Sequence, residues 1–269
     1  MADVDFRRPL LNTEIRRRGI YLLPNLFTTA ALFAGFYAIV MAMNKVYDNA
    51  AVAIFIAMIL DALDGRVARL TRTQSAFGAE YDSLSDMVCF GAAPALIMYE
   101  WALKGLGRFG WIAAFVYCTG AALRLARFNT NIEIVDKRFF QGLPSPAAAG
   151  LIAGFVWTME AFNLEPKRID EMRWLAWALA VFAGLTMVSN VRFYSGKDIN
   201  LRKSVPFGTV VLIAMVVVVL SQVVNNIPEL LFSIFALYAA SGYVIWLAER
   251  IRKRKVPKPP PPPMPPDGL

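Results

Sequence analysis

Residues 61–86 read DALDGRVARLTRTQSAFGAEYDSLSD and lie between two long apolar runs. This acidic segment holds four carboxylates, Asp61, Asp64, Asp82 and Asp86. At about 3.6 residues per turn, the first two lie on one face of a helix and the last two on one face of the next helix. The spacing therefore predicts two acidic helix faces that can meet.

Carboxylates that converge at the edge of a membrane repel one another and lose hydration, so cations or protons must neutralise them. Their hard oxygen atoms favour Mg²⁺ or Mn²⁺, which bind carboxylates together with the phosphates of a substrate. Paired structural charges and the ion pathway of a transporter are alternative interpretations of acids in apolar helices. Two such acids by themselves would favour one of these alternatives over an enzyme.

The composition of the chain predicts a polytopic membrane protein. Its 269 residues are 57% hydrophobic with a mean hydropathy of +0.48, above ordinary soluble domains. The absence of histidine excludes imidazole bases, Ser-His triads and zinc sites that use histidine. Cys89 and Cys118 lie in apolar runs, where a small buried side chain is the usual role, so we assign them no function. The net charge of +8 is spread over the ends of apolar segments, which does not indicate a nucleic-acid partner.

Eight apolar segments are long enough, or nearly so, to cross a hydrocarbon core of about 30 Å. They predict an all-α fold, a polytopic bundle of about eight transmembrane helices, in a catalytic domain at residues 21–248. We expect a cytoplasmic amphipathic arm at 1–20 and a basic, proline-rich cytoplasmic tail at 249–269. Lys and Arg gather beside both termini and the acidic segment, which predicts that these face the cytoplasm from a bacterial-type inner membrane. The eight segments lie near residues 21–43, 48–66, 78–101, 110–128, 145–162, 173–190, 205–224 and 229–248.

The complete spacing of the acidic segment is D-x2-D-G-x2-A-R-x8-G-x3-D-x3-D. It resembles the motif of the CDP-alcohol phosphotransferases, and the match is complete. The resemblance implies the fold of that superfamily and displacement of CMP from a CDP-linked lipid by an alcohol. It also implies two divalent ions, Mg²⁺ or Mn²⁺, held by Asp61, Asp64, Asp82 and Asp86. Asp86 closes the motif and resembles the general base of the family.

The other positions of the motif are expected to contact the nucleotide. Gly65 and Gly78 would let it approach the backbone closely. Arg69 is placed to pair with a phosphate or to hold an Asp, and reaching to the membrane edge is the alternative. Asn25 alone reads as a helix cap, but the resemblance places polar residues of the first helix beside the diphosphate. The expected nucleotide and diphosphate set is Asn25, Thr28, Asp64, Gly65, Ala68, Arg69 and Gly78.

Three longer stretches carry a narrower resemblance, to the bacterial integral-membrane phosphatidylserine synthases. They are DSLSDMVCFGAAPA at 82–95, ALRLARFN at 122–129 and GLPSPAAA at 142–149. Phosphatidylglycerophosphate synthases typically continue their last acids as a DPLADK-like run, and Met87 stands where that lysine would be. The resemblance implies transfer of the phosphatidyl group of CDP-diacylglycerol to L-serine, giving phosphatidylserine and CMP. Another acceptor, such as glycerol 3-phosphate or inositol phosphate, and a cation or proton transporter are the alternatives.

The acceptor is expected at the cytoplasmic end of the fourth segment. Arg124 and Arg127 share a helical face there, within reach of the acids if segments two to four pack together. We expect Arg124, Arg127 and Asn129 to bind serine, with Arg127 holding its carboxylate. Snorkelling of the arginines to lipid headgroups is the alternative. The small residues at 91–95, with the family resemblance, predict a homodimer within membrane lipids.

Overall fold

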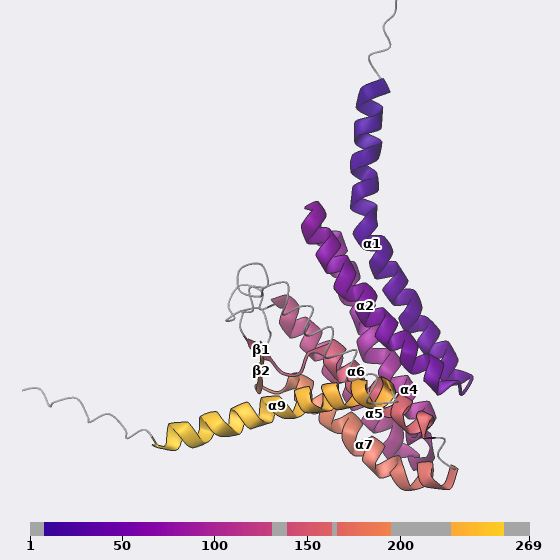
Figure 1. Ribbon diagram of the computed structural model, residues 1–269, viewed down its shortest axis with the longest axis vertical. Coiled ribbons are helices and arrows are strands. Elements are labelled where there is room, and N and C mark those ends of the chain that lie inside the picture. Colours follow the sequence, from indigo (N-terminus) through magenta and orange to yellow (C-terminus); the bar gives the residue numbers. More distant parts are fainter. Residues whose placement is uncertain (1–7, 131–138, 163–165, 195–226, 256–269) are drawn as a thin grey trace, which may run out of the picture.

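The computed structural model describes residues 8–130, 139–162, 166–194 and 227–255. The described chain is a helical bundle from which the start of α1 and the end of α9 project (Figure 1). The prediction of a mainly helical chain is confirmed. The elements in chain order are α1 (Arg8–Met43), α2 (Tyr47–Thr71), α3 (Ala76–Asp86), the π-helix η1 (Met87–Ala92), α4 (Ala93–Trp101), the 3₁₀-helix η2 (Leu103–Leu106), α5 (Arg108–Thr130), β1 (Phe139–Gln141), α6 (Ser145–Ala161), α7 (Pro166–Val188), β2 (Arg192–Tyr194) and α9 (Ile227–Lys255).

A short antiparallel pair of strands departs from the all-α prediction. β1 and β2 pair with Phe140 opposite Phe193. Beside them Gly142, at a φ of 78°, donates its N–H to the carbonyl of Val191 at 2.8 Å. Each strand has three residues, which is too short for an alternation of hydrophobic and polar residues to reveal the strand in the sequence. The pair fixes the entry to α6 against the exit from α7.

Helices α1 and α2 form an antiparallel hairpin that packs through small side chains. The turn between them uses Lys45 in the left-handed conformation, with a φ of 62°. Alanines spaced three or four residues apart allow the two backbones to approach closely. Buried alanines of the two helices that share one core cluster are Ala34, Ala38 and Ala42 of α1, and Ala50, Ala53 and Ala57 of α2.

Helix α6 lies in the centre of the bundle, where it contacts α2, α4, α7 and α9. Every residue from Ala147 to Val156 is buried. Glycines allow α9 to approach closely, because a Cβ at Gly150 would lie 2.7 Å from the ring of Phe235. The small residues of this segment thus serve helix packing, which positions the first residue of α6 beside α5.

Four described helices are long and apolar enough to cross a membrane: Pro24–Met43, Arg108–Thr130, Ile169–Val188 and Ile227–Ala248. They match the first, fourth, sixth and eighth predicted segments. The second segment forms α2 but carries several charges, the third is divided among α3, η1 and α4, and the fifth forms the 17-residue α6. The seventh segment lies outside the described residues. The prediction of a multi-span membrane protein is supported, whereas eight spans are not confirmed.

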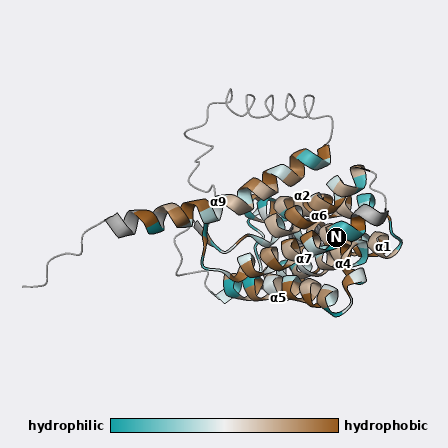
Figure 2. Cartoon of the chain, turned by 90° about the horizontal axis from the view of Figure 1, so that it is seen from below, coloured by the Kyte–Doolittle hydropathy of each residue, from teal (hydrophilic) through white to brown (hydrophobic). Residues whose placement is uncertain are grey.

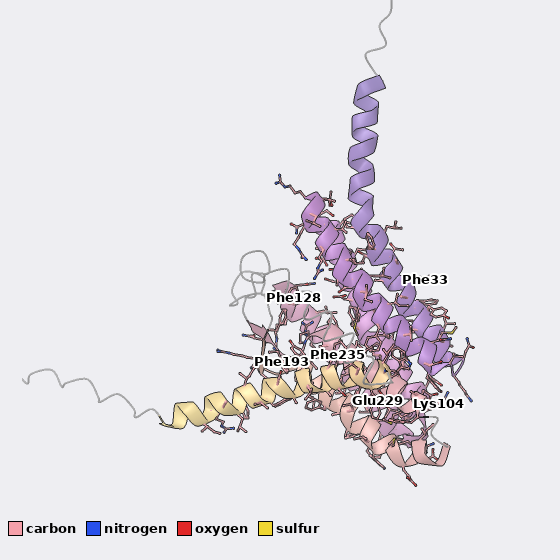
Figure 3. The ribbon with its side chains drawn as sticks, viewed as in Figure 1. Phe33, Lys104, Phe128, Phe193, Glu229 and Phe235 are labelled. Carbon is pink, nitrogen blue, oxygen red and sulfur yellow. The ribbon has the colours of Figure 1, made fainter. Side chains whose placement is uncertain are left out.

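Large apolar side chains lie on the outside of the bundle. Phe33 is 70% exposed and points away from the other helices (Figure 3), and Phe115 and Leu237 are also exposed. Figure 2 shows hydrophobic residues on the outer surface of the helices, including α5 and α9. An apolar exterior of this extent is expected where lipid chains replace water.

The π-helix η1 begins directly after Asp86 and continues α3 into α4. Its buried residues are tied to neighbouring helices, because the thiol of Cys89 donates to the carbonyl of Ala31 at 3.2 Å. The hydroxyl of Tyr117 donates to the carbonyl of Phe90 at 3.0 Å. Such π turns occur often at functional sites, and this one anchors the end of α3 to both α1 and α5.

Candidate active site

The acidic segment folds into the end of α2, a short turn and α3. The turn begins where Arg72 takes the left-handed conformation, with a φ of 54°. Ser75 then caps α3, and its side chain accepts the backbone N–H of Gly78 at 3.0 Å. This reversal brings the carboxylates of the two helices together, as the spacing predicts.

Three of the four carboxylates form one cluster. A carboxylate oxygen from each of Asp61, Asp64 and Asp82 lies within 4.8 Å of the other two. Asp64 is only 4% exposed, and the other two are half-buried. Repulsion among three negative groups this close is unfavourable without a cation.

The carboxylates fit a hard divalent cation. Asp82 Oδ1 is buried and has no hydrogen-bond partner among the described residues. An orphaned carboxylate oxygen is costly to bury, and a metal ion would satisfy it. Oxygen atoms from three side chains at this spacing are a ligand set that Mg²⁺ and Mn²⁺ favour.

Asp86 lies outside the group of three but beside it. Its carboxyl group is in hydrogen-bonding contact with that of Asp61, and the charges of Asp82 and Arg124 also act on it. Asp86 therefore stands between the acidic cluster and an arginine of α5. Its position fits proton transfer at least as well as metal binding.

Thr28 of α1 joins the two acidic helices. Its hydroxyl donates to Asp64 Oδ2 at 2.8 Å, and its carbonyl accepts from the hydroxyl of Ser85 at 3.3 Å. Thr28 is 4% exposed and Ser85 is 3% exposed, so both hydrogen bonds are shielded from water. Thr28, which the sequence places in the nucleotide set, thus contacts an acid of α2 and a serine of α3.

The motif glycines lie beside the expected nucleotide residues. A Cβ on Gly65 would meet only the guanidinium of Arg69, at 3.5 Å, so the apolar packing does not itself require glycine there. A Cβ on Gly78 would lie 3.1 Å from the hydroxyl of Ser75 and 3.4 Å from Asn25 Oδ1. Asn25 and Gly78 are therefore neighbours. Arg69 is exposed, and its charge acts on Asp64, as expected for the alternative in which Arg69 holds an Asp.

The two arginines expected at the acceptor point to different partners. Arg124 Nη1 donates to the hydroxyl of Ser145 at 2.8 Å. Arg127 Nη1 lies 3.4 Å from the carbonyl of Ser189 and from Asn190 Oδ1, beyond the end of α7. Arg124 is thus the one whose charge acts on Asp86.

The third expected acceptor residue bonds to the acidic helix. Asn129 Nδ2 donates to the hydroxyl of Ser83 at 3.0 Å. Asn129 is exposed at the end of α5, whereas Ser83 lies on α3 directly after Asp82. The bond therefore links the helix of the arginines to the helix of the acids.

A model of the family described as CDP-alcohol phosphatidyltransferase matches residues 21–182. The chain belongs to this family. The matched range contains the whole acidic segment, α5 and most of α7, so the site built above lies inside the CDP-alcohol phosphatidyltransferase domain.

Curated relatives of the chain carry one name across bacteria, archaea and yeast, CDP-diacylglycerol–serine O-phosphatidyltransferase. The relative from Helicobacter pylori strain 26695 is 36% identical over 230 residues, which is 85% of this chain and 92% of the relative. The relative from Methanocaldococcus jannaschii is 35% identical and covers 65% of this chain and 75% of its own length. The relative from Saccharomyces cerevisiae is 37% identical over 46% of this chain and 50% of its own length.

Within this family domain, the structure adds residues that the sequence did not single out. Ser85 bonds Thr28, Ser145 bonds Arg124, and the hydroxyl of Tyr81 lies 3.0 Å from that of Thr29. Ser85 lies in the stretch DSLSD and Ser145 in GLPSPAAA, both of which carry the family resemblance. Membership of these stretches is the feature of the sequence that could have indicated the two serines. Their partners lie on distant helices, so the spacing along the chain does not reveal the contacts.

Proposed function

We propose that the chain is a CDP-diacylglycerol–serine O-phosphatidyltransferase of the CDP-alcohol phosphatidyltransferase family. The observation that carries the proposal is the complete acidic motif, in which Asp86 lies close enough to Arg124 for their charges to interact. An acid and an arginine suit the hydroxyl and the carboxylate of one amino acid. The name shared by relatives covering most of the chain supports serine as the acceptor.

In the proposed reaction, the serine hydroxyl attacks the phosphorus that carries diacylglycerol. A new oxygen–phosphorus bond forms, the bond to CMP breaks, and CMP leaves with the electron pair. Asp86 accepts the hydroxyl proton, a role supported by its place beside the group of three acids. The products are phosphatidylserine and CMP.

Asp61, Asp64, Asp82 and Asp86 are the residues proposed to hold two divalent ions, Mg²⁺ or Mn²⁺. Bound there, divalent ions would supply positive charge that stabilises the diphosphate and the departing CMP. Arg69 is proposed to pair with a phosphate. Thr28 orients the carboxylate of Asp64 through its hydrogen bond to Oδ2. The proposed nucleotide set is completed by Asn25, Gly65, Ala68 and Gly78.

The remaining features of the proposal concern the membrane. We propose eight spans in a catalytic domain at 21–248, with the arm, the tail and the site on the cytoplasmic side of an inner membrane. A homodimer is proposed from the family resemblance, since most of the small residues at 91–95 are buried within this chain. A monomeric mass both in detergent and in nanodiscs would overturn the dimer without touching the reaction.

The deciding experiment supplies purified protein with radiolabelled CDP-diacylglycerol, Mn²⁺ and one acceptor at a time. L-serine, glycerol 3-phosphate and inositol phosphate form the panel, and labelled lipid and released CMP are both measured. We expect phosphatidylserine and CMP in equal amounts with serine. Preference for glycerol 3-phosphate would replace the serine assignment, and failure to bind CDP or CMP with Mn²⁺ would favour a transporter.

A further inference from the structure

The guanidinium of Arg124 has one N–H group that donates a hydrogen bond and another, also buried, that has no acceptor in the described chain. Its Nη1 donates to Ser145, which is fully buried at 0% exposure. Its Nε is buried and has no hydrogen-bond partner in the part of the chain that the structure describes. A buried N–H without an acceptor is unfavourable, so a ligand that brought an acceptor to this N–H would gain a hydrogen bond.

The geometry of a guanidinium decides what this free donor can bind. Its N–H groups form pairs of parallel donors, each matched to the two oxygens of a carboxylate. Because Ser145 holds Nη1, the side edge formed by Nε and Nη2 of Arg124 is the pair that remains for a ligand. A lysine at the same place would supply charge but no such edge.

Charges around Arg124 favour an anion between it and the acids. Ser145 is the first residue of α6, so the positive end of that helix lies beside the guanidinium. Asp86 acts on Arg124 electrostatically, but the two form no direct ion pair in the described chain. A small zwitterion can bridge the gap, with its carboxylate at the arginine and its hydroxyl at Asp86.

We propose that the Nε–Nη2 edge of Arg124, oriented by Ser145, binds the carboxylate of the amino-acid acceptor. This assignment rests on the proposed serine transfer and places the carboxylate at Arg124 instead of Arg127. Arg127 donates toward the end of α7 through two contacts of 3.4 Å, away from Asp86. Ser145 acts through Arg124, so it is a positioning residue that determines specificity.

The test compares Michaelis constants for serine and for CDP-diacylglycerol in Arg124→Lys, Ser145→Ala and Ser145→Thr. For Arg124→Lys and Ser145→Ala, we expect the constant for serine to rise about tenfold or more beyond any change in that for CDP-diacylglycerol. Ser145→Thr keeps the hydroxyl and should restore the constant toward wild type. Thr158→Val is the matched control, because it removes another buried hydroxyl of α6 that bonds only within its own helix, to Gly154 at 2.8 Å.

A second readout uses ethanolamine, which is serine without its carboxylate. Wild-type protein should prefer serine strongly, and Arg124→Lys should narrow that preference because the carboxylate no longer gains its paired bond. If Arg124→Lys and Ser145→Ala both keep the wild-type Michaelis constant for serine and the wild-type preference for serine over ethanolamine, this assignment is wrong. The proposed serine transfer would not be affected by that result. Failure of wild-type protein to use serine overturns the proposed function itself.

Discussion

The two sides of the site carry charges of opposite sign, and each side bonds to a neutral hydroxyl. On the α2–α3 side, Asp61, Asp64 and Asp82 crowd one another, and a neutral hydroxyl from Thr28 is the hydrogen-bond donor to Asp64. On the α5 side, Arg124 is held by the neutral hydroxyl of Ser145. Each side therefore keeps its charge largely unpaired within the described chain. This difference in sign is the reason that we propose cations for the acidic side and an anion for the basic side.

The largest effect is expected from removing charge on the acidic side. Asp61→Asn and Asp82→Asn should each lower turnover about a hundredfold or more, because an amide is a poorer ligand for a divalent ion. Turnover at saturating Mn²⁺ and the calorimetric affinity for Mn²⁺ are the measurements. Asp48→Asn is the control, since Asp48 is exposed at the opposite end of α2. Near-normal rates in both variants would remove the metal assignment from this side.

A smaller effect is expected when the Asp64 carboxylate stays but loses the hydrogen bond that orients it. Thr28→Val removes the 2.8 Å hydrogen bond to Asp64. Loss of a bond that orients a metal ligand typically costs about 10- to 100-fold in affinity or activity, so the Mn²⁺ needed for half-maximal rate should rise. Thr29→Val is the matched control, because the neighbouring hydroxyl contacts Tyr81 instead of an acid. Equal metal requirements in the two variants would contradict a role for Thr28 in aligning the cluster.

The smallest effect is expected from the second arginine of the basic side. Arg127→Lys should raise the Michaelis constant for serine by about threefold or less, since its contacts to Ser189 and Asn190 are long and weak. The same assay on Arg124→Lys provides the comparison. If the Michaelis constant for serine rises more in Arg127→Lys than in Arg124→Lys, the serine carboxylate should be assigned to Arg127.

The sequence predicts the acidic side well because its information is local. The four aspartates sit at helical spacing on two adjacent helices, so periodicity alone brings them to one place. The basic side depends on long-range packing: Arg124 meets Ser145 because α6 lies at the centre of the bundle, and spacing along the chain cannot show this. The span count is confirmed only in part, because the sequence counts α2 and α6 as spans, whereas four other described helices are long and apolar enough to cross a membrane. The β1–β2 pair is too short to leave a pattern.

Thr28 has a consequence that reaches beyond the site. It lies four residues into the apolar span Pro24–Met43 and touches α2 through its hydroxyl and α3 through its carbonyl. Helices tilt to match the thickness of the bilayer around them. We therefore expect a change in the tilt of α1 to move the carboxylates of the two acidic helices relative to each other. The spacing of these carboxylates should then depend on the thickness, and so on the lipid composition, of the bilayer.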